Sequence, residues 1–101
     1  MYVAMLEGRV VGVCGLNVDP FAADEGVGRV RRLFVSKMMR RRGVGLAMMR
    51  RIMEDARGRF RELHLRTFNP EACAFYEGMG FERVMGDEKC THRCEVEHAK
   101  A

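Results

Sequence analysis

The segment from Met39 to Arg51, MRRRGVGLAMMRR, constrains the fold of this chain more than any other stretch. The β-prone run RVRRLFV ends shortly before it, and Gly43 and Gly45 then separate three arginines from an apolar stretch rich in methionine. From Gly43 to about Arg57 the apolar residues recur at helical spacing, in a stripe formed by Val44, Met48, Ile52 and Ala56. This period predicts an amphipathic helix soon after a strand.

Strand-like and helix-like segments interleave along the rest of the chain. Alternation and turn residues predict strands near residues 2–6, 10–16, 29–35, 61–67, 81–85 and 90–96, and helices near residues 43–57 and 69–80. The turn around Gly8 makes the first two strands a hairpin, and Asn69 followed by Pro70 is typical of a helix start. The order β-β-β-α-β-α-β-β predicts one layered α/β (α+β) domain over residues 1–101, with two helices on a mixed, mostly antiparallel sheet.

The arginine-glycine junction has the chemistry of an anion site. The first N–H groups of a helix lack intrahelical partners, and the helix dipole adds partial positive charge there. Gly43 and Gly45 carry no side chain, so a phosphate can approach these N–H groups, and the arginines can add charge-assisted hydrogen bonds. The P-loop pattern is absent, and Met48 stands where the dinucleotide pattern has its third glycine. The alternative is a basic surface patch with an incidental Gly-x-Gly.

Two motifs resemble those of the GCN5-related N-acetyltransferases (GNAT family). RRRGVG matches that family's acetyl-CoA signature, (Gln or Arg)-x-x-Gly-x-(Gly or Ala), at Arg40, Gly43 and Gly45. NPEACAFYEGMGF is similar to a later family motif at Asn69, Tyr76, Gly80 and Phe81. The resemblance extends over roughly residues 1–97, and it implies the family's fold, acetyl-CoA as co-substrate and an amine as acceptor.

The resemblance also implies roles for individual residues. The backbone of Leu33, Phe34 and Val35 would pair with the pantetheine arm as a pseudo-strand. The pyrophosphate would be bound by the segment Arg40, Arg41, Arg42, Gly43, Val44, Gly45 and Leu46. Asn69 would help to bind the cofactor, and Tyr76 would donate a proton to the departing CoA thiolate. The alternative for Tyr76 is a ring packed on the sheet with its hydroxyl at the surface.

No general base is identified in the sequence. Asp24 and Glu25 are the nearest acids before the third strand, but a solvated loop is the favoured interpretation for both. Family members usually begin with a strand and two helices that wall the acceptor site, whereas this chain begins at what resembles the second strand. The acceptor groove is then either open or covered by a second subunit, and we expect a homodimer.

Two other functions stay open. One is an acyl-CoA-binding module without transferase activity, which the short N-terminal part favours. The other is a basic nucleic-acid-binding domain, which the net charge of +4 allows. Single-strand binding would need aromatic side chains interleaved with the basic ones, and that pattern is missing. Nucleic acid is therefore not the expected partner.

The cysteines and the apolar runs bear on location and on metal binding. Glu7 and Arg9 interrupt the first apolar stretch, and no apolar run reaches membrane length. We expect a cytoplasmic protein with no membrane segment, its four cysteines reduced. Cys90, His92 and Cys94 share one face of a predicted strand and invite a zinc site. Three ligands along one straight strand lie too far apart to close on one ion, so no metal is expected.

Overall fold

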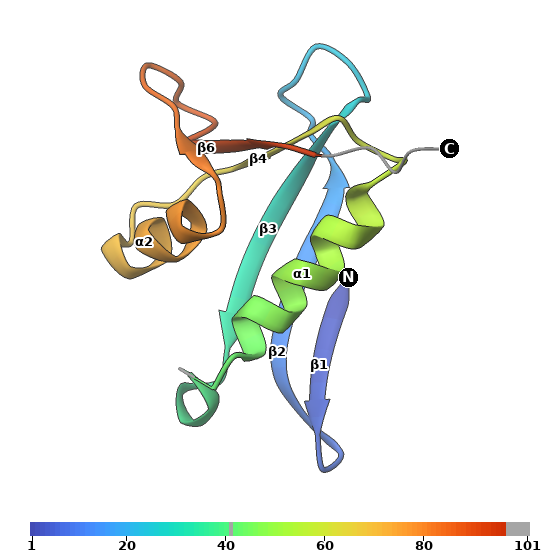
Figure 1. The fold of residues 1–101 in the computed structure, drawn as a ribbon, viewed down its shortest axis with the longest axis vertical. Coiled ribbons are helices and arrows are strands. Elements are labelled where there is room, and N and C mark those ends of the chain that lie inside the picture. Colours follow the sequence, from blue (N-terminus) through green and yellow to red (C-terminus); the bar gives the residue numbers. More distant parts are fainter. Residues whose placement is uncertain (41, 97–101) are drawn as a thin grey trace.

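Six strands form one sheet in the computed structural model, which describes residues 1–40 and 42–96 (Figure 1). In chain order the elements are β1 (Tyr2–Leu6), β2 (Arg9–Val18), β3 (Val27–Val35), the short 3-10 helix η1 (Lys37–Met39), α1 (Val44–Ala56), β4 (Glu62–Leu65), α2 (Pro70–Gly78), β5 (Glu82–Arg83) and β6 (His92–Glu95). The strands lie in the order β1-β2-β3-β4-β6-β5, and β3 and β4 run parallel while the other neighbours run antiparallel. The predicted order of strands and helices is confirmed, and η1 is the one addition.

The hairpin of β1 and β2 closes through Glu7 and Gly8, whose φ angles are 50° and 78°. Positive φ at both central residues is the geometry of a type I′ turn, which matches the right-handed twist of the flanking strands. Glycine reaches this conformation without strain, which is why Gly8 marks the turn in the sequence.

β3 separates from β4 after its first residues. The parallel pairing joins Val27–Arg29 to Glu62–His64, and beyond Arg29 the register given for β3 is with β2 alone. Figure 1 shows β3 running on toward η1 while β4 leads away toward α2. The edge of β3 that faces away from β2 is therefore open along its second half.

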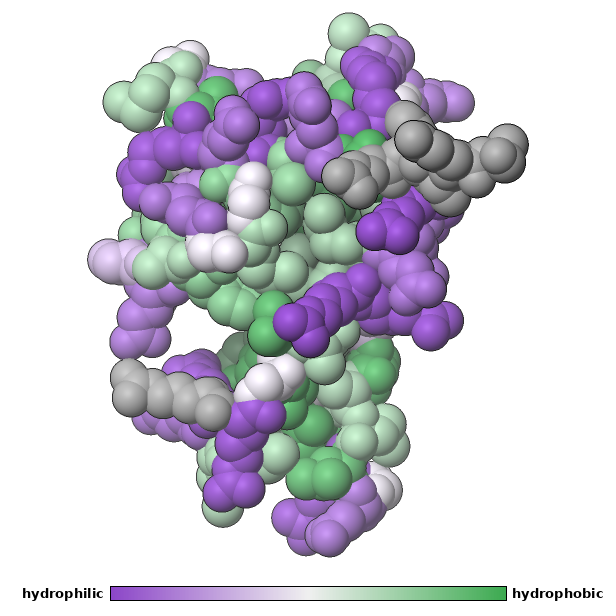
Figure 2. Space-filling view, in the orientation of Figure 1, coloured by the Kyte–Doolittle hydropathy of each residue, from purple (hydrophilic) through white to green (hydrophobic). Residues whose placement is uncertain are grey.

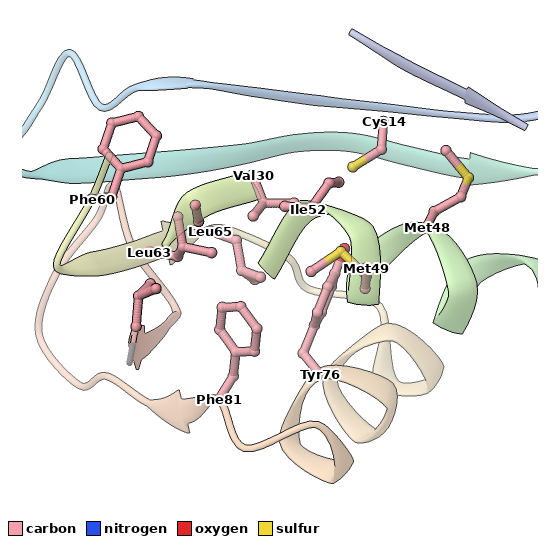
Figure 3. Close-up of a cluster of buried hydrophobic side chains, with 12 residues drawn as sticks. Cys14, Val30, Met48, Met49, Ile52, Phe60, Leu63, Leu65, Tyr76 and Phe81 are labelled. Carbon is pink, nitrogen blue, oxygen red and sulfur yellow. The ribbon is translucent and has the colours of Figure 1, made fainter. Parts of the chain in front are cut away.

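The core lies between α1 and the sheet (Figure 3). The predicted stripe of α1 faces this core, with Met48, Ile52 and Ala56 buried and Val44 partly buried. The rings of Tyr76 and Phe81 fill the same core from the side of α2. The methionines of α1 are therefore core residues. Both helices are too short to cross a bilayer within the described part of the chain.

The last strand carries the predicted inward face. Cys90, His92 and Val96 are buried, and Cys94 is half-buried. The His92 Nε2 atom lies 2.8 Å from a carboxylate oxygen of Glu77, so the side chain of β6 fixes the position of α2. All four cysteines are free thiols.

Candidate active site

The first helix begins without a cap. Its N-cap residue is Gly43, at a φ of 78°, and no side chain accepts a hydrogen bond from the first turn. Only glycine adopts this left-handed conformation freely. No acidic residue lies in the first turn, so nothing neutralises the positive end of the helix dipole. The N–H groups that open α1 are consequently available to an anionic ligand.

The remaining residues of this segment leave room beside the helix start. A Cβ atom on Gly45 would lie 3.7 Å from the ring of Phe75 and 3.7 Å from the side chain of Val35, which is ordinary contact. Val44 packs partly against the core, and Leu46 is half-buried. Figure 2 shows a notch in the outline of the molecule between α2 and the segment that joins β3 to α1.

The arginines do not all face the helix start. The Arg40 Nε atom donates a hydrogen bond to the carbonyl of Val35 at 3.1 Å, and its guanidinium lies 5.8 Å from the centroid of the Phe34 ring. Arg40 is therefore oriented toward the end of β3. Arg42 is exposed, and Arg41 lies outside the described residues. Their predicted roles in pyrophosphate binding stay predictions.

The backbone of β3 presents hydrogen-bonding groups at its open edge. The Ser36 N–H donates to the carbonyl of Val11 on β2 at 2.8 Å. Because backbone groups alternate along a strand, those of Phe34 also face β2, whereas those of Leu33 and Val35 point away from it. The pairing predicted for residues 33–35 can thus use Leu33 and Val35, but the backbone of Phe34 is directed toward β2.

A bulge interrupts β3 at the start of this open edge. Val13 pairs with Phe34 and Gly15 pairs with Arg31, so two residues of β3 lie opposite the single residue Cys14. Arg32, one of these two, has a φ of 52°, a left-handed conformation that arginine rarely adopts. Such strain is concentrated at functional sites.

Cys14 lies on the core side of the bulge and is almost fully buried. Its thiol is 3.6 Å from the carbonyl of Arg31, a weak hydrogen bond. Burial raises the pKa of the Cys14 thiol to about 11, so the thiol is neutral near pH 7. Cys14 is not among the site residues predicted from the sequence.

Tyr76 comes from α2 into the same region. Its ring is buried, with ring centroids 5.3 Å from Phe75 and 5.5 Å from Phe81 in edge-to-face geometry. Figure 3 shows Tyr76 directed from α2 toward Met49 of α1. Burial, and then the charge that a Cys14 thiolate would carry, raise the pKa of Tyr76 well above its usual value. The phenol therefore stays protonated near neutral pH.

Asn69 caps the second helix, as its place in the sequence predicts. Its side-chain oxygen accepts hydrogen bonds from the N–H groups of Glu71 at 2.8 Å and Ala72 at 3.2 Å. Asn69 is exposed, and the NH₂ group of its side chain is not used by the cap. A contact to the cofactor is thus compatible with the cap and stays a prediction.

The two candidate bases before β3, Asp24 and Glu25, differ in their surroundings. Both oxygens of Asp24 accept hydrogen bonds from Arg61, at 2.6 Å and 2.8 Å. The Arg61 guanidinium and the Gly26 N–H lower the pKa of Asp24 to about 2, which is too low for a base that accepts a proton near neutral pH. Glu25 is exposed in the same loop.

The site combines an uncapped helix start, an open strand edge and a buried phenol. Comparison with known proteins identifies a family that agrees with this arrangement. Residues 1–81 match the model of the acetyltransferase (GNAT) family. The chain belongs to this family. The GNAT fold is therefore established for this chain by both its sequence and its sheet order.

Two GNAT relatives illustrate how far the likeness extends. The chain is 32% identical over 81 residues to N-alpha-acetyltransferase RimI of Mycobacterium tuberculosis, an alignment that covers 76% of this chain and 48% of RimI. The crystal structure of a protein assigned as an acetyltransferase from Exiguobacterium sp. 255-15 superposes with a TM-score of 0.81 at 32% identity. That alignment covers 92% of this chain and 60% of the Exiguobacterium protein.

A second similar structure contains the coenzyme. Rv2747 from Mycobacterium tuberculosis, crystallised in complex with CoA, superposes with a TM-score of 0.69 at 28% identity. The alignment covers 85% of this chain and 50% of Rv2747. The chain thus spans about half the length of RimI and of Rv2747.

Proposed function

We propose that this GNAT domain transfers an acetyl group from acetyl-CoA to an amine. The observation that carries the proposal is the open edge of β3, whose last residue, Val35, lies beside Gly45 in the first turn of α1, while Cys14 opposite its bulge shares a core cluster with Tyr76. One side of this site offers N–H groups to a phosphate, and the other offers a proton to a leaving group. Rv2747, with which the chain is 28% identical, was crystallised with CoA, which supports the choice of co-substrate.

The cofactor would lie along the gap between β3 and α2. Its pyrophosphate would contact the N–H groups from Val44 to Leu46, with Gly43 and Gly45 allowing the close approach. The pantetheine amides would pair with the backbone of Leu33 and Val35, as an added strand pairs with a sheet edge. Arg40 would release the carbonyl of Val35 on binding, since that carbonyl now accepts its hydrogen bond.

The reaction would proceed by direct transfer. The nitrogen lone pair of a neutral amine attacks the thioester carbon, and a backbone N–H on the open edge of β3, on the side of its bulge away from the pyrophosphate, stabilises the developing oxyanion. The C–S bond then breaks, its electron pair goes to sulfur, and the Tyr76 hydroxyl protonates the thiolate. The new N–C bond leaves a proton on nitrogen, which passes to water or to a base. Tyr76 regains its proton from solvent.

The identity of the acceptor is a separate part of the proposal. RimI of Mycobacterium tuberculosis is named as an N-alpha-acetyltransferase, so an amino-terminal amine belongs in any acceptor panel. The second candidate function is an acyl-CoA-binding module without turnover. It is favoured by the engagement of Asp24, the nearest candidate base, in two hydrogen bonds with Arg61.

A binding screen followed by a turnover assay tests both candidates. Acetyl-CoA and CoA should raise the melting temperature and ATP should not, because a ligand that binds only the folded state stabilises it. Release of free CoA should then be measured with small amines, lysine side chains and peptide N-termini. Turnover with any of them supports the transferase. Coenzyme binding without turnover on the whole panel supports the binding module, and no coenzyme binding contradicts both.

We also propose that the protein is a cytoplasmic homodimer. Free thiols suit a reducing compartment. β1 is an edge strand with Val3 and Met5 exposed, and such an edge is commonly covered by another strand or subunit. Sedimentation should show a dimer at micromolar concentration, and a monomer across that range would exclude it.

A further inference from the structure

A pocket lies at the bulge of β3, apart from the start of α1. Its volume is about 490 Å³, within the range of small-molecule sites. Residues of both β2 and β3 line it, together with the first residue of the chain: Met1, Val13, Gly15, Leu16, Asn17, Arg31 and Arg32. Cys14 also lines it, and Cys14 belongs to the core cluster that contains Tyr76. The pocket therefore adjoins the proposed reaction centre.

The pocket opens on the face of the sheet opposite α1. A Cβ atom on Gly12 would touch Met48 and Val44 of α1, so even-numbered residues of β2 in this stretch face the helix. Gly15 consequently faces the other way, and a Cβ atom there would lie 3.6 Å from the Cβ atom of Arg31. Tyr76 belongs to the core cluster on the α1 side of the sheet, and the pocket lies on the opposite face.

Two arginines of this pocket have no counter-charge. Arg29, Arg61 and Arg93 each form an ion pair with a carboxylate. Within the described ranges neither Arg31 nor Arg32 forms an ion pair, and no acidic residue lines the pocket. The Arg31 Nε atom is buried and lacks a hydrogen-bond partner. Buried donors are nearly always satisfied, so the guanidinium of Arg31 lacks an acceptor within the described residues, while other atoms of Arg31 line the pocket.

The backbone conformation adds a second, independent observation. Arg32 holds a left-handed φ of 52°, which is unfavourable for a side chain with a Cβ atom. The bulge that results inserts one extra residue into β3, so that adjacent arginines line the same pocket. A regular strand would send consecutive side chains to opposite faces.

We propose that Arg31 and Arg32 bind an anionic group, a carboxylate or a phosphate, on the acceptor amine. Two adjacent guanidinium groups suit such a group because each can donate paired hydrogen bonds to its oxygens. The anion would hold the acceptor on the face opposite α1, with its amine directed at the thioester along the open edge of β3. This inference rests on the proposed function, since it names the substrate class of the same site.

Matched pairs of acceptors test the charge requirement. The first pair is an α-amino acid and its amide, and the second is phosphoethanolamine and ethanolamine, each assayed at a pH where equal fractions of the amine are neutral. We expect kcat/KM to be at least tenfold higher for the anionic member of one pair, and the pair that shows it distinguishes carboxylate from phosphate. Equal kcat/KM within both pairs overturns the proposal and leaves the transferase function intact.

Variants then assign the preference to the two arginines. Arg31→Met and Arg32→Met should raise KM for the anionic acceptor at least tenfold, with little change in KM for its neutral partner and in the affinity for acetyl-CoA. Arg50→Met is the matched control, since Arg50 is exposed on α1. Arg32 is exposed, so its variant keeps the test valid even if Arg31→Met fails to fold. A preference that survives in Arg32→Met and in a folded Arg31→Met overturns the assignment.

Binding without turnover separates failure of this inference from failure of the proposed function. If no amine is acetylated, calorimetry with an N-acetyl amino acid and with its amide, both in the presence of CoA, decides the matter. Binding of the acid alone, lost in Arg32→Met, supports the anion site in a protein that is not a transferase under these conditions. Binding of neither, or of both equally, contradicts the anion site.

Discussion

The two helices of this domain begin in opposite ways. α1 starts at Gly43 with no side-chain cap and no acid in its first turn, whereas α2 starts at Asn69 with a capping side chain, Pro70 and Glu71. Asn69 satisfies two of the N–H groups that open α2, and Glu71 offsets the positive end of its dipole. The start of α1 has neither a capping side chain nor an acidic residue in its first turn.

This difference indicates that the start of α1 is suited to binding a ligand, whereas α2 is suited to holding a side chain in a fixed position. A helix that satisfies its own N-terminus contributes stability and a fixed orientation, which is what a helix carrying Tyr76 needs. A helix with glycine at its N-cap gives up some of that stability, roughly a few tenths of a kcal/mol, and keeps its N–H groups for a ligand. The comparison therefore agrees with the proposal that the start of α1 binds acetyl-CoA and that α2 carries the proton donor.

The largest expected effect is on the chemistry assigned to α2. Tyr76→Phe removes only the hydroxyl and keeps the ring between Phe75 and Phe81, so packing is preserved. We expect kcat to fall by roughly ten- to a thousand-fold, at or somewhat below the usual contribution of a general acid. The affinity for acetyl-CoA should change little. Turnover and cofactor titration on the same preparation check this, and unchanged turnover would make Tyr76 a structural residue.

The next effect is on the affinity assigned to α1. Gly45→Val places a branched side chain beside the N–H groups of the first turn, so the affinity for acetyl-CoA should fall at least about tenfold, or ~1.4 kcal/mol. Gly78→Val is the matched control, because Gly78 is also helical, lies at the end of α2, and has open space around its Cβ position. Calorimetry on both variants should separate them. Equal affinities in the two would exclude a phosphate site at Gly45.

The fold was largely predictable because its signals are local. The helical period of residues 44–56, the turn at Gly8 and the cap at Asn69 each act within a few residues, and each is present in the structure. The separation of β3 from β4 was not predictable in this way. It depends on where the parallel pairing stops, at Arg29 and His64, which are far apart in the sequence.

The site was predictable in part for the same reason. The glycines at the start of α1 and Tyr76 lie in contiguous motifs, whereas Cys14 enters the site only because β2 lies beside the bulge of β3. One sequence signal could have located the bulge. Val30 and Leu33 both pack toward the core although they are three residues apart, and a period of two cannot place both there without an extra residue.

A smaller effect tests whether Asn69 serves α2 alone. Asn69→Ala removes the cap and should destabilise the fold by about 1 kcal/mol, which lowers the melting temperature by roughly 4–8 °C in a domain of this size. Asn69→Asp keeps the capping oxygen and removes the side-chain NH₂ group. A stable Asn69→Asp protein with wild-type affinity for acetyl-CoA would restrict Asn69 to capping. A stable Asn69→Asp protein with weaker affinity would assign the NH₂ group to the cofactor.

The last effect concerns the neutral thiol of Cys14 on β2. Burial raises the pKa of the Cys14 thiol from 9.0 to about 11, so between these values the folded protein keeps a proton that the unfolded chain has lost. The free energy of unfolding must then decrease as pH rises through this window, and the full contribution of Cys14 is present only below about pH 9. We expect the melting temperature of Cys14→Ala to fall less steeply between pH 8 and pH 10.5 than the melting temperature of the wild type, whatever the two values are at pH 8.

Tyr76→Phe, measured in parallel, is the control. It removes the phenol of Tyr76, the other buried acid near Cys14, whose pKa is also raised. Parallel curves for the wild type and Cys14→Ala would show that the Cys14 thiol titrates alike in the folded and unfolded chains, and would contradict its placement in a dry site beside the bulge.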